Sequence, residues 1–140
     1  MKFETDIDLI ITVVKKGWAE KALEASINAG ARGGTIMYGR GVGIHEQKTL
    51  LGMRIEPEKE ILLTAVRSDN EDVILMAIAE AVELDKPGNG VSMVIPLKKL
   101  VGRAHIFTDP EPTETTETIP AVEPENPVQT DAPSAPPGTD

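Results

Sequence analysis

The sequence contains no cysteine and few aromatic residues, and both absences narrow the classes of protein that it can encode. Without cysteine there is no disulfide, no thiolate metal site and no cysteine nucleophile. Aromatic residues make up only 3% of the chain and no basic stripe accompanies them, so we expect no nucleic-acid partner. No apolar run approaches the roughly 18 residues of a membrane span, and residues 1–6 contain no apolar core of signal-peptide length. We therefore expect a cytoplasmic protein that does not insert into a membrane.

Positive charge is absent from residues 108–140. This stretch holds eight of the 23 acids and eight of the 11 prolines, which leaves 15 acids against 14 bases in residues 1–107. A segment so poor in apolar residues cannot bury enough surface to offset the entropy lost on ordering. We predict a folded domain over residues 1–107 and a disordered, acidic tail rich in proline and threonine over residues 108–140.

Hydrophobic patterns in the first part predict the element order β-α-β-β-α-β. Strands are expected over residues 8–14, 35–38, 50–55 together with 60–67 as one strand interrupted near Pro57, 91–96, and 102–107 as a short fifth strand. Helices are expected over residues 18–29, with Gly30 at the end, and from a Ser-x-x-Glu capping box at 68–71 to residue 84.

This order is that of the ferredoxin-like α+β fold, a four-stranded antiparallel sheet with two helices on one face. The other face of such a sheet stays bare and apolar. Exposed apolar patches of that size are usually covered by another protein surface. The pattern therefore predicts an oligomer.

Two glycine-rich loops are the candidate ligand-binding elements. Gly39-Arg40-Gly41-Val42-Gly43 follows the second strand, and Lys86-Pro87-Gly88-Asn89-Gly90 precedes the fourth. Glycine lets the backbone approach an anion closely, and backbone N–H groups can cradle a phosphate. Arg40, Lys86 and Arg103 add positive charge near the two loops. Each loop taken alone is equally compatible with a simple turn, and we expect neighbouring subunits to bring the two loops together.

At this point the sequence resembles the PII nitrogen-regulatory signalling family. The matching pieces are Gly33-Gly34-Thr35-Ile36, the two glycine loops, and Glu56-Pro57-Glu58-Lys59-Glu60-Ile61, in this order over about residues 8–106. The resemblance implies a homotrimer with adenine nucleotide (ADP, AMP or ATP) in the clefts between subunits, with the need for magnesium left open. The nucleotide-binding residues that it implies are Thr35, Arg40, Gly41, Val42, Gly43, Leu62, Leu63, Thr64, Lys86, Pro87, Gly88, Asn89, Gly90 and Arg103.

The resemblance also implies that a T-loop docks onto a membrane transporter or an enzyme. The residues that it assigns to this loop are Ile44, His45, Glu46, Gln47, Lys48 and Thr49. This stretch is shorter than the family's usual T-loop and contains no tyrosine or serine, so we expect no uridylylation or serine phosphorylation. Glu58 stands where the family places a lysine for 2-oxoglutarate, which predicts no 2-oxoglutarate sensing. The charged trio at residues 58–60 is expected to be a solvated strand end.

The leading hypothesis from the sequence is a nucleotide-sensing regulator without catalytic activity. A PII-like sensor of bicarbonate that serves carbon uptake is one alternative, since a small anion needs only a few N–H groups and one cation. A trimeric metal-binding protein of the same fold is another, although the sequence offers few ligands and we assign no metal site. An enzyme is disfavoured because there are only two separated histidines and no carboxylate pair beside a nucleophile.

Overall fold

The computed structural model of the chain describes residues 3–44, 46, 48–102 and 138. Residues 103–107 of the predicted fifth strand lie outside this set, as does nearly all of the predicted tail. The division of the chain at residue 107 therefore stays a prediction.

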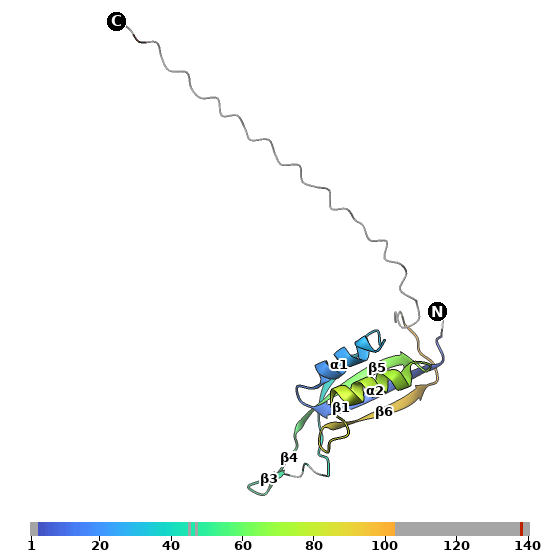
Figure 1. Cartoon of the computed structure of the whole chain (residues 1–140). Helices are drawn as coiled ribbons and strands as arrows, with labels where there is room; N and C mark the ends of the chain where they lie inside the picture. Colours follow the sequence, from blue (N-terminus) through green and yellow to red (C-terminus); the bar gives the residue numbers. More distant parts are fainter. Residues whose placement is uncertain (1–2, 45, 47, 103–137, 139–140) are drawn as a thin grey trace. The chain divides into compact units, whose positions relative to one another are not determined.

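The ferredoxin-like fold predicted from the sequence is confirmed (Figure 1). Four strands form an antiparallel sheet in the order β2-β5-β1-β6, so β5 and β1 are central. The strands of this sheet are β1 (Ile7–Lys15), β2 (Thr35–Arg40), β5 (Glu58–Arg67) and β6 (Gly90–Leu97).

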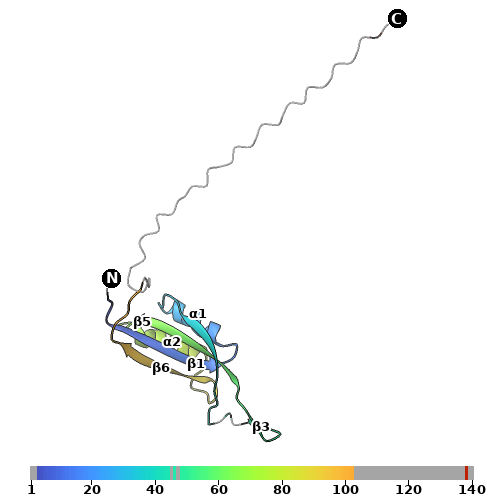
Figure 2. The same cartoon turned by 180° about the vertical axis from the view of Figure 1, so that it is seen from behind.

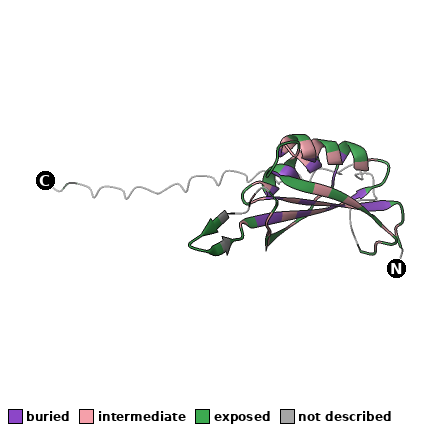
Figure 3. Ribbon diagram, turned by 90° about the horizontal axis from the view of Figure 1, so that it is seen from below, coloured by how far each residue is buried: buried purple, intermediate pink, exposed green. Residues whose placement is uncertain are grey.

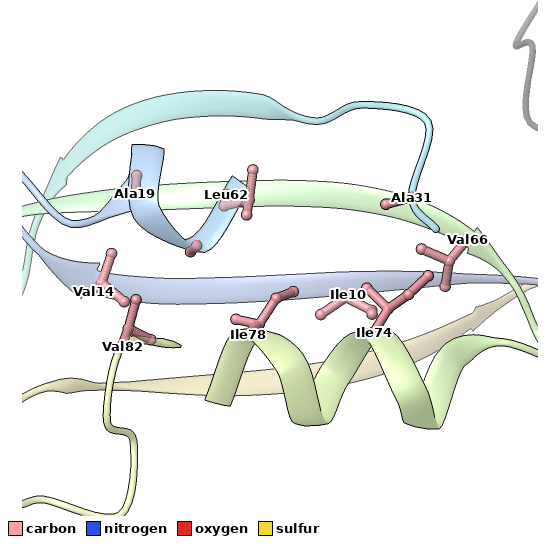
Figure 4. Close-up of a cluster of buried hydrophobic side chains, with 10 residues drawn as sticks. Ile10, Val14, Ala19, Ala31, Leu62, Val66, Ile74, Ile78 and Val82 are labelled. Carbon is pink, nitrogen blue, oxygen red and sulfur yellow. The ribbon is translucent and has the colours of Figure 1, made fainter. Parts of the chain in front are cut away.

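Both helices lie on the same face of the sheet, as the edge-on view in Figure 3 shows. They are α1 (Ala19–Asn28) and α2 (Glu71–Ala81), and they lie side by side. Alternate residues of the central strands point towards them and close the core (Figure 4). The buried cluster consists of Ile10, Val14, Ala19, Ala22, Ala31, Leu62, Val66, Ile74, Ile78 and Val82.

The end of α1 confirms the prediction at Gly30. This residue has φ 114°, and its N–H donates to Ile27 O at 3.0 Å. The next amide, that of Ala31, donates to Ser26 O at 2.9 Å. These two bonds satisfy carbonyls that the helix end would otherwise leave without donors, and glycine reaches the required conformation at little cost.

The predicted capping box at residues 68–71 is wrong. Helix α2 begins at Glu71 with Asn70 at the N-cap, and no side chain caps it. The Ser68 N–H donates to Asp6 O at 2.9 Å, which ties this residue to the chain before β1. Asn70 Nδ2 donates instead to Ala29 O at 3.3 Å and so links the start of α2 to the end of α1. The helix also ends earlier than predicted, at Ala81 rather than at residue 84.

The single interrupted strand predicted over residues 50–55 and 60–67 is also wrong. Residues 48–55 form a separate two-stranded hairpin of β3 (Lys48–Leu50) and β4 (Met53–Ile55), which projects beyond the sheet in Figures 1 and 2. Its turn residues Leu51 and Gly52 have φ 51° and 78°, the two positive values of a tight type I′ hairpin turn. The segment between β2 and β5, here named the β2–β5 connection, therefore spans residues 41–57 and is longer than the short loop predicted at 44–49.

The charged trio at residues 58–60 is not a solvated strand end. Lys59 and Glu60 are each only 8% exposed, and Glu58 alone is exposed. Glu60 points to the helix layer, where its Oε2 accepts the Ala19 N–H at 2.9 Å. A carboxylate at the first turn of a helix satisfies a free amide and complements the helix dipole. Glu60 thus supplies to α1 the cap that Trp18, at the N-cap position, lacks.

The face of the sheet opposite the helices is apolar and has no cover within the described residues. Figure 2 shows this face from the side away from α1 and α2. The strand register places the following residues on it: Leu9, Ile11, Val13, Met37, Ile61, Leu63, Ala65, Val91, Met93 and Ile95. Their partial exposure agrees with the predicted need for a covering surface.

One buried hydroxyl on the helix side of the sheet makes no hydrogen bond. Thr64 is fully buried, and its Oγ1 has no partner among the described residues. Burying an unpaired hydroxyl costs about 1–3 kcal/mol. We therefore expect Thr64→Val to raise the free energy of unfolding by about 1 kcal/mol, measured by urea denaturation.

Thr12 offers the matched control for this prediction. It is also fully buried, but its hydroxyl forms a 2.8 Å hydrogen bond with Ser92 Oγ. Thr12→Val should lower the stability, because it removes this hydrogen bond. A loss of stability in both variants would contradict the assignment of Thr64 as the unpaired group.

Candidate functional site

A pocket of about 350 Å³ lies at the end of the sheet where β2 ends and β6 begins. Residues from both glycine loops line it, together with residues from the starts or ends of the strands. The lining residues are Val13, Gly41, Val42, Gly43, Ile44, Glu46, Lys59, Gly88, Gly90 and Val91. The two loops thus meet within one chain, where the sequence led us to expect that neighbouring subunits would bring them together.

The last glycine of the first glycine loop, Gly43, binds a carboxylate. The Gly43 N–H donates to Glu46 Oε2 at 3.1 Å, and the Glu46 N–H donates to Gly43 O at 3.0 Å. Lys59 Nζ donates to both oxygens of the same carboxylate, at 2.6 and 2.8 Å. An ammonium group and a backbone amide therefore converge on one position in the pocket, which makes it a position suited to an anion.

Sequence reasoning missed Lys59 and underrated Glu46. The signal that could have found Lys59 is strand alternation. Successive residues of a strand face opposite sides, so Lys59 shares the open face of the sheet with Ile61 and Leu63. A lysine at the end of such an apolar stripe is a candidate for a sheltered cation. Glu46 was assigned to the T-loop, and nothing in the sequence pairs it with Lys59.

Side-chain hydrogen bonds hold the second glycine loop in shape. Asn89 is buried, its Nδ2 donates to Glu83 O at 2.9 Å, and its Oδ1 accepts from Lys15 Nζ at 3.2 Å. Lys15 Nζ also lies 3.6 Å from the centre of the Trp18 ring, a favourable cation–π position. Both ends of the Asn89 amide are therefore used within the chain, and this residue shapes the loop.

Lys86 is paired with an acid of its own chain. Its Nζ lies 2.5 Å from Glu83 Oε1, and both side chains remain largely exposed. The hydrogen bond with Glu83, and the charge of Glu83, raise the pKa of Lys86. The same contact lowers the pKa of Glu83. Exposed pairs of this kind are weak, so the Lys86 ammonium can exchange partners easily.

The second glycine loop begins β6 with a close backbone contact. Gly90 has φ 149°, and a Cβ placed on it would lie 2.2 Å from Val13 O. Only a residue without a side chain fits between β1 and β6 at this point. The contact brings Val13 and Gly90 together on the wall of the pocket.

Several residues of the implied nucleotide site do not line the pocket. Leu62 and Thr64 are fully buried on the helix side of the central strand β5, and Leu63 faces the open side. Thr35 is exposed and pairs with Leu63, towards the far end of β2 from the pocket. Pro87 and Asn89 belong to the second loop but are not among the lining residues, and neither is Lys86.

Arg40 lies in a different hollow, of about 520 Å³, with Lys16, Tyr38, Gly39 and Glu58. There Lys16 forms an ion pair with Glu58, and the two side chains are more than half exposed. Glu58 is therefore outside the pocket of the glycine loops. The absence of 2-oxoglutarate sensing, which the sequence analysis attached to Glu58, stays a prediction.

Three of the predicted residues, His45, Gln47 and Arg103, lie outside the described residues. Among the described residues, no group of three or more metal-binding side chains (histidine, cysteine, aspartate or glutamate) could hold a metal ion. No helix in the same part of the chain is long and apolar enough to cross a membrane.

The likeness of this chain to known proteins is structural. No protein-family model matches the sequence, and no curated protein matches it. Among solved structures, the chain is similar to that of Arabidopsis thaliana PII bound to citrate, with a TM-score of 0.52 and 18% sequence identity. The match covers 67% of this chain and 77% of the other. At this identity the likeness concerns the fold: the chain shares the ferredoxin-like fold of a PII protein.

Proposed function

We propose that this chain is a PII-like regulator without catalytic activity that binds an adenine nucleotide at the pocket of the two glycine loops. The observation that carries the proposal is the convergence of Lys59 Nζ and the Gly43 N–H on one anion position between these loops. A phosphate group suits such donors. Lys86, two residues before the lining residue Gly88 in the second glycine loop, supplies a second cation once it leaves Glu83.

The spacing along the sheet supports a nucleotide rather than an isolated phosphate. The resemblance to the PII family implies that Thr35 lies near the adenine; Thr35 pairs with Leu63, and Gly39 pairs with Lys59. The two positions are four residues apart along the strand, which is roughly 13 Å. This distance is comparable with the length of an extended nucleoside diphosphate, so adenine near Thr35 and phosphates near Lys59 are compatible.

The bare face of the sheet supports the homotrimer. Its apolar residues run across all four strands, and the side chains of Val91, Met93 and Ile95 are 42–51% exposed. A surface of this kind favours association between copies of the chain. A sedimentation mass near that of a single 15.0 kDa chain would contradict the trimer.

The β3–β4 hairpin supports docking of the β2–β5 connection onto a partner transporter or enzyme. Leu50, Leu51 and Met53 at its tip are 62%, 90% and 70% exposed. Apolar side chains gathered on a projecting hairpin are typical of a binding surface. Cross-linking in cell extract, with Leu51→Ser as the control, tests this docking. If the unchanged chain and Leu51→Ser capture the same proteins at the same yield, docking through the hairpin is contradicted.

Calorimetric titration with AMP, ADP and ATP, with and without magnesium, tests nucleotide binding. We expect Gly41→Val and Lys86→Ala each to weaken binding, because the first obstructs the pocket and the second removes a cation. The loss for Lys86→Ala should be on the order of tenfold, as for one charge-assisted hydrogen bond. Unchanged affinity in both variants would refute the site.

A small carboxylate or bicarbonate is the second candidate ligand. The specific observation in its favour is that Lys59 already holds a carboxylate, that of Glu46. The similar PII structure is bound to citrate, itself a carboxylate. Titration with bicarbonate, citrate and 2-oxoglutarate, in the absence of nucleotide, separates this candidate from the first.

A further inference from the structure

The anion position of the pocket is filled by a side chain of the protein itself. The Glu46 carboxylate accepts two hydrogen bonds from Lys59 Nζ and one from the Gly43 N–H, at 2.6, 2.8 and 3.1 Å. These donors are the ones to which the proposed function assigns the ligand. A carboxylate therefore occupies the place where a phosphate would bind.

This pair differs from the other ion pairs of the described residues in its shelter from water. The side chains of Lys59 and Glu46 are 10% and 23% exposed, whereas those of Lys86 and Glu83 are 59% and 44% exposed. Sheltered charges are screened little by salt and attract each other more strongly than exposed ones. Among these pairs, only that of Lys59 and Glu46 joins a largely buried cation to the pocket.

The same pair fastens one part of the fold to another. Lys59 belongs to the central strand β5, and Glu46 belongs to the β2–β5 connection, two residues before β3 begins. The hydrogen bonds of Glu46 thus hold the start of the exposed β3–β4 hairpin against the end of the sheet. Release of Glu46 would free the hairpin from this anchor.

We propose that Glu46 is a built-in competitor for the ligand, so that nucleotide binding and anchoring of the β2–β5 connection exclude each other. The inference rests on the proposed function. A phosphate that takes the three hydrogen bonds of Lys59 and Gly43 displaces Glu46, and the start of the hairpin loses its anchor at the end of the sheet. By thermodynamic linkage, a change that strengthens the contact of Glu46 with Lys59 and Gly43 lowers the affinity for the ligand by the same factor.

Glu46→Gln tests the competition. Glutamine keeps the size and the acceptor oxygen but lacks the charge, so we expect ADP without magnesium to bind on the order of tenfold tighter than to the unchanged chain. Glu56→Gln is the matched control, because it removes an exposed acid from the same connection outside the pocket. It should leave the ADP affinity unchanged, and circular dichroism checks that both variants keep the fold.

Limited proteolysis tests the anchor. Lys48 and Arg54 in the hairpin are trypsin sites, and mass spectrometry reports cleavage after each. We expect faster cleavage in Glu46→Gln than in the unchanged chain. ADP should accelerate cleavage of the unchanged chain and have little effect on the variant.

The outcomes separate the two proposals. Equal ADP affinity in the unchanged chain and in Glu46→Gln would overturn the competition and leave the nucleotide site in place. No ADP binding to either protein would overturn the proposed function, and the competition with it. Tighter binding without any change in cleavage would refute the anchor, because the ligand would then displace Glu46 without releasing the hairpin.

Discussion

Replacement of Gly90 by alanine is expected to lower the free energy of unfolding by about 3–5 kcal/mol, one of the largest losses for a single methyl group. The added Cβ would lie 2.2 Å from Val13 O and 3.1 Å from Val14 Cα. Both are backbone atoms of the central strand β1, so no side chain can turn away to relieve the clash. Gly90 also has φ 149°, which is unfavourable for alanine. Urea denaturation measures the loss.

Gly88 provides the control for this prediction. It has φ 86° in the same loop, but a Cβ placed on it would meet nothing within 4 Å. Gly88→Ala therefore carries the conformational cost alone, about 1 kcal/mol. Equal losses in the two variants would show that β1 and β6 can separate to admit a side chain. A much larger loss for Gly90 would establish that backbone contact, rather than loop flexibility, fixes this glycine at the pocket.

The strands and helices could be predicted because their signals are local. The β-branched run that begins at Asp8, the apolar spacing of Ile74 and Ile78, and Gly30 after α1 each depend on residues close together in the chain. Each of these signals corresponds to an observed element. Local periodicity is sufficient for these elements because each of them buries one face against a single core.

The errors arose where distant residues decide the structure. Ser68 fits a capping box locally, yet its amide is held by Asp6 and the helix begins three residues later. Leu51 carries no turn signal, since a leucine with positive φ is uncommon. The β3–β4 hairpin was therefore read as part of a longer strand.

The candidate site was predicted in outline but not in its charges. Gly41, Gly43, Gly88 and Gly90 line one pocket, so both predicted loops contribute to the candidate site. The cation that reaches into the pocket is Lys59, which the sequence assigned to a solvated strand end. Its partner, Glu46, belongs to the β2–β5 connection, and a pattern within β5 cannot reveal this contact.

Lys59→Met is expected to lower the ADP affinity by about 10- to 100-fold, as for the loss of a hydrogen bond to a sheltered charge. Methionine retains most of the apolar stem and removes only the ammonium group. The fold should lose little stability, because the Glu46 side chain is 23% exposed and can turn towards water. Calorimetric titration measures the affinity, and thermal unfolding measures the stability.

Lys16→Met is the matched control, since it removes the same charge from an exposed ion pair with Glu58. Its effect on ADP should be small and should vanish at high salt, whereas the effect of Lys59→Met should persist, because a sheltered charge is screened less. A double variant tests whether Glu46 weakens ADP binding by competing for Lys59 or by repelling the nucleotide directly. If Glu46 acts only through this lysine, Glu46→Gln should no longer tighten ADP binding in a chain that carries Lys59→Met. A gain of the same size in both backgrounds would mean that Glu46 repels the nucleotide directly, without competing for Lys59.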